Sequence, residues 1–325
     1  MPSSGSALLA RWLRVVLIGA SLLAGSAFAQ YPNKPIRLVV PFPPGGSADV
    51  VARSVAQALG QGLGQPVVVE NKGGADGMIA GEAVMSAPPD GYTLLLATNT
   101  AFNAAPILHK VVPYNPVTDF TPVGKVGNFG FFLFVNDATP ARTLAQLLDY
   151  ARANPGKLAY GSGNSTSIVA TARLAQQARV ELVHVPYKGD APLALDLLAG
   201  RVQMAIATGT LLPHVKEGKL RVLATLLPER AALVPEVPTL PEAGAAAIPM
   251  TPWAGIFGPA RMPREVVDRL ARALVRALAQ PEVRDQLERV AFQPQSSSPD
   301  ELAQLLREQL EIWARAAKEA GLNPQ

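Results

Sequence analysis

The chain has 325 residues, and 29 Lys and Arg against 25 Asp and Glu give it a formal net charge of +4. It has no cysteine, which excludes a disulfide framework, a thiolate metal site, a Cys nucleophile and a lipoprotein anchor. The basic residues are scattered and form no run interleaved with aromatic residues. The sequence therefore predicts no nucleic-acid partner.

The first 29 residues have the layout of a secretory signal peptide. Arg11 and Arg14 form a basic region, an uncharged apolar run follows over residues 15–24, and Ala27 and Ala29 are the small residues that a leader peptidase requires. The alternative is an uncleaved anchor, but the apolar run is shorter than the roughly 20 residues that span a bilayer. We therefore predict export, cleavage after Ala29 and a periplasmic location.

After this leader, strands alternate with helices, which predicts a largely parallel sheet covered by helices. In the first half of the chain we predict strands over residues 36–40, 67–70 and 92–97, with helices that begin near residues 47 and 78. The proline-rich stretch of residues 113–122 is interpreted as a crossover or a loop beside a hinge.

A second series of units begins at residue 131. We predict strands over residues 131–135, 158–160, 182–185, 202–207 and 220–226, helices over residues 144–153 and 192–198, and a helix that follows the loop of residues 161–167 and ends near residue 178. The chain is predicted to be helical from residue 263, with a last helix near residues 301–318. A chain of this size is close to the limit of about 250–300 residues at which one core divides, so two lobes are expected.

Three polar loops, residues 43–49, 98–103 and 162–167, follow the C-terminal ends of predicted strands. Open parallel sheets bind ligands at this edge, where free backbone N–H groups and helix dipoles attract anions. The alternative for each loop is ordinary turn and cap chemistry. Asp49 supports that alternative, because a carboxylate in a first helical turn would repel a bound anion. From the loops alone, both interpretations stay open.

Candidate catalytic groups are few. The three histidines, His109, His184 and His214, lack the spacing of a metal pair, so we interpret each as structural and expect no metal site. There is no G-x-S-x-G elbow and no phosphate loop, and we expect no cofactor. Tyr187 and Lys188 follow a strand and could reach an anion, and the alternative is a turn with a solvated Lys.

Several segments together resemble the Bug/TctC receptors of tripartite tricarboxylate transporters. In chain order they are residues 31–37 (YPNKPIR), 41–49 (PFPPGGSAD), 66–71, 89–94 (PDGYTL), 160–162 (YGS), 184–189 (HVPYKG), 218–221 (GKLR) and 234–244. Each motif is short, and the resemblance depends on their joint order over residues 31–320.

The resemblance implies an α/β fold of the periplasmic binding protein type II class, with two lobes joined by a two-strand hinge. We place lobe 1 at residues 31–130 plus 228–325 and lobe 2 at residues 131–227. The implied function is that of a receptor, not an enzyme. It would capture a small mono-, di- or tricarboxylate or an aromatic acid for the permease subunits of a tripartite tricarboxylate-type transporter. The alternatives are an exported hydrolase of a carboxylated ester and a binding module that signals to a membrane sensor.

The resemblance assigns ligand contacts to the three loops and to the end of one strand, with main-chain donors and bound water holding the carboxylate. Together with Tyr187, the predicted ligand-binding residues are Phe42, Pro43, Pro44, Gly45, Gly46, Ser47, Asp49, Thr98, Asn99, Ser162, Asn164, Ser165, Thr166, Ala207 and Thr208.

The chain also departs from many relatives. Val169 and Arg173 stand where a His and a Glu are common, Met78 stands where Asn is common, and the strand that ends at Ala207 does not continue to an acidic residue. These missing acidic groups weaken the case for an amine-bearing ligand such as an amino acid. We therefore expect a plain mono- or dicarboxylate or an aromatic acid, and tight binding of an amino acid would contradict this expectation.

Overall fold

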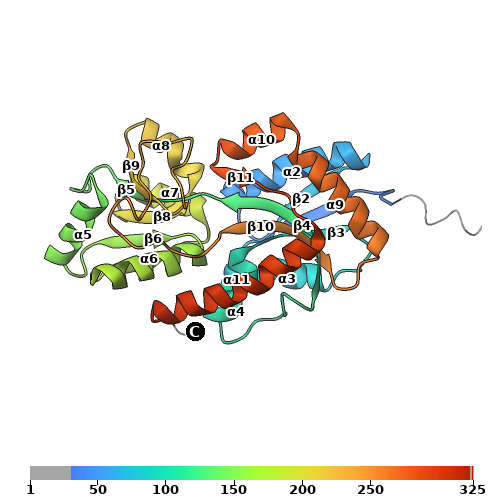
Figure 1. Ribbon diagram of the computed structural model, residues 1–325, viewed down its shortest axis with the longest axis horizontal. Helices are drawn as coiled ribbons and strands as arrows, with labels where there is room; N and C mark the ends of the chain where they lie inside the picture. Colours follow the sequence, from blue (N-terminus) through green and yellow to red (C-terminus); the bar gives the residue numbers. More distant parts are fainter. Residues whose placement is uncertain (1–30, 323, 325) are drawn as a thin grey trace, which may run out of the picture.

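The computed structural model describes residues 31–322 and 324, and the predicted signal peptide, residues 1–29, lies outside them. The described chain forms two β-sheets that are packed against helices (Figure 1). The strand order is β11-β4-β10-β3-β1-β2 in the six-stranded sheet and β7-β6-β8-β5-β9 in the five-stranded sheet. We call the six-stranded sheet with its helices the first lobe and the five-stranded sheet with its helices the second lobe.

The first lobe is built from both ends of the described chain. Its strands are β1 (Ile36–Val40), β2 (Val67–Asn71), β3 (Thr93–Thr98), β4 (Phe120–Phe129), β10 (Trp253–Pro259) and β11 (Phe292–Pro294). Its helices are α2 (Ser47–Leu63), α3 (Met78–Met85), α4 (Ala105–Leu108), α9 (Arg264–Leu278), α10 (Pro281–Glu288) and α11 (Pro299–Glu319). It also contains a short 3-10 helix, η1 (Ala75–Gly77), and a short π-helix, η2 (Thr100–Ala104).

The second lobe comes from the middle of the chain. Its strands are β5 (Phe131–Asn136), β6 (Ala159–Ser162), β7 (Val183–Pro186), β8 (Met204–Thr208) and β9 (Leu220–Thr225). Its helices are α5 (Leu144–Ala153), α6 (Ser165–Ala178), α7 (Asp190–Leu198) and α8 (Leu212–Lys216), with the short turn η3 (Gly209–Leu211).

The inner strands of the first lobe carry apolar residues on both faces. β1 pairs in parallel with β2 and β3, whereas β10 runs antiparallel to β3 and β4. In Figure 1, α2 and α9 lie above this sheet and α3 and α11 lie below it. Burial on both faces explains why Leu94, Leu95 and Leu96 follow one another without polar residues between them.

The prediction of a loop over residues 113–122 is wrong in its last part, because β4 begins at Phe120 and includes Pro122. Proline has no N–H to donate to a ladder and is found in sheets at edges and irregularities. Pro122 pairs with Phe257 beside a register shift between β4 and β10, so the irregularity accommodates it. β10 and β11 have no predicted counterpart.

Two crossing segments join the lobes. β4 ends at Phe129 and β5 begins at Phe131, and the chain returns between β9 and β10. The two crossings are hydrogen-bonded to each other on both sides of Gly130. The Phe129 N–H donates to the Pro252 carbonyl over 2.7 Å, and the Leu226 N–H donates to the Phe131 carbonyl over 2.9 Å. The predicted architecture, two α/β lobes joined by two crossing strands, is confirmed.

The segment after β9 packs against the second lobe. Ala231, Val234 and Val237 are buried in the same apolar cluster as Phe132 of β5, and the segment forms a bridge between Thr225 and Thr239. The predicted lobe boundaries stay a prediction. These contacts lead us to propose that residues 228–240 belong with the second lobe.

Helix α11 connects the lobes a third time. Its start is fixed by a capping box in which the Ser298 hydroxyl and the Glu301 carboxylate each accept a backbone N–H. Near its end, Glu319 forms an ion pair with Arg173 of α6, with 2.6 Å between the two atoms. Figure 1 shows this helix running below the hinge from the first lobe toward α6. None of the described helices has both the length and the apolar character needed to cross a bilayer.

Candidate ligand-binding site

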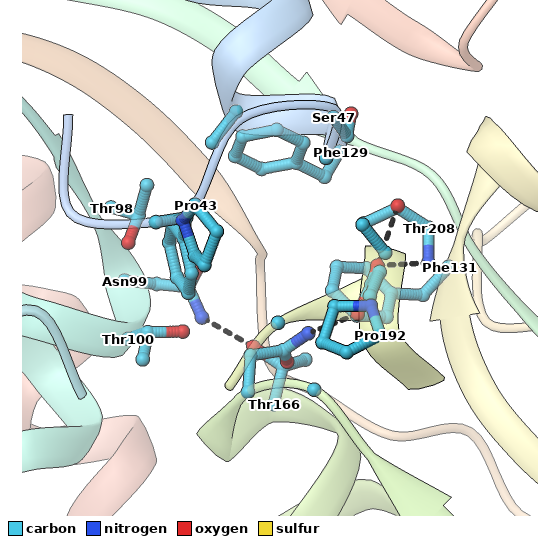
Figure 2. Close-up of a pocket in the computed structure, with 18 residues that line it drawn as sticks. Pro43, Ser47, Thr98, Asn99, Thr100, Phe129, Phe131, Thr166, Pro192 and Thr208 are labelled. Carbon is cyan, nitrogen blue, oxygen red and sulfur yellow. Dashed lines mark hydrogen bonds between the residues drawn. The ribbon is translucent and has the colours of Figure 1, made fainter. Parts of the chain in front are cut away.

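A cavity lies between the lobes, next to the hinge (Figure 2). The first lobe contributes the loop after β1, the start of α2 and the end of β3. The second lobe contributes the starts of α6 and α7 and the end of β8. The lining residues are Phe42, Pro43, Gly46, Ser47, Ala48, Thr98, Asn99, Thr100, Phe129, Phe131, Gly163, Asn164, Thr166, Gly189, Asp190, Ala191, Pro192 and Thr208.

The wall from the first lobe includes several hydrogen-bond donors. Gly46 is the N-cap residue of α2, and no side chain caps this helix, so N–H groups of the first turn are left for other acceptors. The hydroxyls of Ser47 and Thr98 are buried without a hydrogen-bond partner in the described part of the chain. A buried hydroxyl normally has a partner, and both residues line the cavity, so a ligand that accepts hydrogen bonds would satisfy them.

Asp49 does not line the cavity, although it lies in the same loop. Its carboxylate accepts hydrogen bonds from the Gly45 N–H (3.1 Å) and from the Asn71 amide (2.9 Å), and it pairs with Arg53 at 2.9 Å. Burial by itself would raise the pKa of Asp49, but these interactions outweigh it and lower the pKa below its usual value. Asp49 therefore holds the loop in place, and Arg53 neutralises the charge that would repel an anion.

Two direct contacts close the cavity. The Asn99 amide of the first lobe donates to the Thr166 hydroxyl of the second lobe over 2.7 Å, and Figure 2 shows these side chains meeting across the space. Gly189 faces Pro43, where an added Cβ would lie 3.3 Å from the proline ring. Gly189 has a φ of +114°, so glycine suits both its backbone conformation and its close approach to Pro43.

The wall from the second lobe contains a buried carboxylate, Asp190, which is 7% exposed. One of its oxygens accepts hydrogen bonds from the Thr208 N–H (3.0 Å) and hydroxyl (2.6 Å), and the other accepts one from the Asn164 amide (3.2 Å). Burial raises the pKa of Asp190, against the lowering effect of the bonds from Thr208 and Asn164. Asp190 was not among the predicted contacts, although an acid directly after Gly189 at a helix start is visible in the sequence.

Nine of the predicted contacts line the cavity. They are Phe42, Pro43, Gly46, Ser47, Thr98, Asn99, Asn164, Thr166 and Thr208. Seven lie outside the lining. They are Pro44, Gly45, Asp49, Ser162, Ser165, Tyr187 and Ala207. The hinge residues Phe129 and Phe131 were not predicted, because their place beside the cavity depends on the crossing of the two lobes.

Tyr187, Ser165 and Ala207, three of these seven residues, are held by contacts outside the cavity. The Tyr187 hydroxyl donates to Asp196 over 2.8 Å, away from the cavity lining. Ser165 is buried at the start of α6. Ala207 pairs with Phe132 inside the five-stranded sheet. Their roles in ligand binding stay predictions.

Ser162 and His184 bear on the hydrolase alternative, because their side chains are 2.6 Å apart. A serine nucleophile requires a base that a third group orients, and it must reach the substrate. His184 stacks on Tyr160, and none of the hydrogen bonds among the described residues joins it to a carboxylate. Burial lowers the pKa of His184. The pair links β6 to β7. Since Ser162 does not line the cavity, the pair gives the hydrolase alternative no support.

Two lobes, a hydrogen-bonded hinge and a cavity between them define a class, the clamshell binding proteins that close around a small molecule. The family model that matches residues 51–322 is described as tripartite tricarboxylate transporter family receptor. The chain belongs to this family, whose members are periplasmic solute-binding receptors and not enzymes.

Relatives and solved structures agree with this assignment. A UPF0065 protein of Pseudomonas sp. (strain P51), encoded in the tcbD-tcbE intergenic region, is 38% identical over 320 residues, which is 95% of each chain. The structure of R. palustris Rpa4515 with adipate is 32% identical with a TM-score of 0.88, and the match covers 91% of this chain and 100% of that one. MatC (Rpa3494) from Rhodopseudomonas palustris with bound malate is 31% identical with a TM-score of 0.83, over 88% and 99% of the chains.

Proposed function

We propose that this receptor captures a small carboxylate between its lobes and delivers it to the permease subunits of a tripartite tricarboxylate-type transporter. The observation that carries the proposal is the pair of buried hydroxyls without partners, Ser47 and Thr98, beside the uncapped start of α2. A carboxylate accepts up to about four hydrogen bonds, and it would satisfy these donors.

The cavity offers a carboxylate neutral donors. None of the residues that line it is Lys, Arg or His, and the acidic lining residue, Asp190, belongs to the second lobe, so the neutral donors of the first lobe would hold a carboxylate. Hydrogen bonds to an ionised acceptor are short and about twice as strong as neutral ones, and exclusion of water by the closed lobes strengthens them further. The adipate and malate that the two neighbouring structures contain also support a carboxylate here.

A thermal-shift screen of the mature protein against small carboxylates and their amides tests this function. A ligand at 100 times its dissociation constant adds about 2.7 kcal/mol of apparent stability. We expect a clear shift with at least one carboxylate and none with the matching amide. A folded protein that responds equally to both, or to neither, would contradict the proposal.

Delivery and location need separate measurements. We expect the mature protein to be recovered from the periplasmic fraction, with Gln30 as its first residue by mass spectrometry. In addition, we expect ligand-loaded protein to co-purify with transporter membrane subunits. Co-purification with a sensor kinase alone would favour the alternative of a signalling module.

A further inference from the structure

Asp190 is a buried carboxyl group for which the described residues supply no cation. Its carboxylate lines the cavity, and no ion pair joins it to a Lys, Arg or His among residues 31–322. Its three hydrogen bonds come from neutral groups of Thr208 and Asn164. Buried charges in proteins are normally paired, so Asp190 differs from Asp49, which lies in the opposite lobe and has Arg53 as its partner.

The hydrogen bonds around Asp190 are compatible with its ionised form. The Asn164 side-chain oxygen accepts from the Ser167 N–H at 3.0 Å, which fixes the amide orientation and leaves its nitrogen to donate to Asp190. The other Asp190 oxygen accepts from the Thr208 N–H. Both oxygens accept hydrogen bonds in this arrangement, which suits the ionised form. Burial raises the pKa of Asp190, and a cationic partner would favour ionisation. Asp190 also lies in the first turn of α7, where the helix dipole favours a negative charge.

We propose that the ligand carries a protonated amine, or a comparable cationic hydrogen-bond donor, that pairs with Asp190, in addition to the carboxylate held by the first lobe. This inference rests on the proposed function and narrows its substrate class to amino-carboxylates. The first lobe supplies donors from Ser47 and Thr98, and the second lobe supplies an anionic acceptor, so a zwitterion complements both walls. The aromatic ring of Phe131 also lines the cavity, and an aromatic face attracts a cation.

This inference replaces the expectation of a plain carboxylate. That expectation relied on the missing acidic residue after the strand that ends at Ala207. The structure brings a carboxylate from another element to the same place, because Asp190 at the start of α7 is hydrogen-bonded to Thr208, the residue that follows Ala207. An acid is therefore present at the end of β8, although it is supplied from a different position in the chain.

The test uses matched probes that differ only in one group on the same carbon frame. The three sets are aspartate, malate and succinate; glutamate, 2-hydroxyglutarate and glutarate; and phenylalanine, 3-phenyllactate and 3-phenylpropanoate. Isothermal titration of the mature protein gives a dissociation constant for each. In the set that binds, we expect the member with an amine to bind roughly 30-fold or more tightly than the member with hydrogen in its place. This is the loss expected when a buried charge pair loses one partner.

Asp190→Asn keeps the shape of the side chain and removes its charge, so we expect it to abolish this preference. Asp149→Asn is the matched control, because it removes an exposed carboxylate from α5 of the same lobe, and it should keep the preference. The ranking in the wild-type protein remains a test even if Asp190→Asn does not fold.

The possible failures are distinct. Binding of the deaminated members with equal or greater affinity would overturn this inference and leave the carboxylate receptor standing. A preference for the amine that survives in folded Asp190→Asn would also overturn it. Failure of a folded protein to bind any member of the three sets would count against both the inference and the proposed function.

Discussion

The hydrogen bond between Asn99 and Thr166 allows a quantitative test of lobe closure. Thr166→Val keeps the branched shape of the side chain and removes the hydroxyl that accepts from the Asn99 amide over 2.7 Å. Both residues are at most 2% exposed. In the closed form the variant therefore leaves the buried Asn99 N–H without an acceptor. In an open form, water would accept a hydrogen bond from it.

The expected effect follows from this difference between the two forms. An unsatisfied buried donor costs about 1–3 kcal/mol. Since 1.4 kcal/mol corresponds to a factor of ten, closure should become about 5- to 150-fold less favourable, and the apparent affinity for ligand should fall by the same factor.

Isothermal titration with the tightest-binding carboxylate of the screen measures this loss. Thr171→Val is the matched control, because Thr171 lies on the same helix with a buried hydroxyl that has no partner among the described residues, and it does not line the cavity. We expect its affinity to be unchanged. In a double-mutant cycle, Asn99→Ala and Thr166→Val should be coupled by at least about 0.5 kcal/mol. Affinity within twofold of wild type for Thr166→Val, or an equal loss in Thr171→Val, would refute the reasoning.

Three further outcomes are expected. Ser47→Ala should weaken carboxylate binding about tenfold, because it removes one donor to a charged acceptor. Ser54→Ala removes another buried hydroxyl of α2 that has no partner among the described residues, and it should leave the affinity unchanged. Equal effects of the two substitutions in titrations would contradict the assignment of Ser47. Asp49→Asn should lower the free energy of unfolding at neutral pH. The pKa of Asp49 is lowered in the folded state, so its contribution to the free energy of unfolding is present above about pH 4 and is lost as the pH falls. The denaturation curves of variant and wild type should therefore converge in acid. A difference in stability that stays constant with pH would exclude the ionised carboxylate as the source of that stability. The Trp253 indole N–H donates to the Asn103 side chain over 2.9 Å. Asn103→Ala should destabilise the protein by about 1–3 kcal/mol, because it leaves this buried N–H without an acceptor. An unchanged urea midpoint would show that the bond contributes nothing to stability.

Features that depend on neighbouring residues could be predicted from the sequence. The Gly-rich loop before α2, the helix cap at Asn164 and the alternation of strands and helices reflect local turn, cap and periodicity preferences. They indicated the three loops from which much of the cavity is built. Asn164 caps α6, and its side-chain oxygen accepts the Ser167 N–H at 3.0 Å, which is the cap chemistry named as the alternative for these loops.

Features that depend on strand order could not be predicted in this way. Asp190 and Thr208 are 18 residues apart, and they meet because β8 lies inside the five-stranded sheet beside β6, which no local pattern specifies. The same holds for Phe129 and Phe131, which reach the cavity because the chain crosses between lobes at that point. The sequence by itself determined the receptor class and predicted the polar loops that would supply donors for a carboxylate. Only the tertiary structure decided that the Asp190 carboxyl group lines the opposite wall of the cavity, because that wall is assembled from residues distant in the chain.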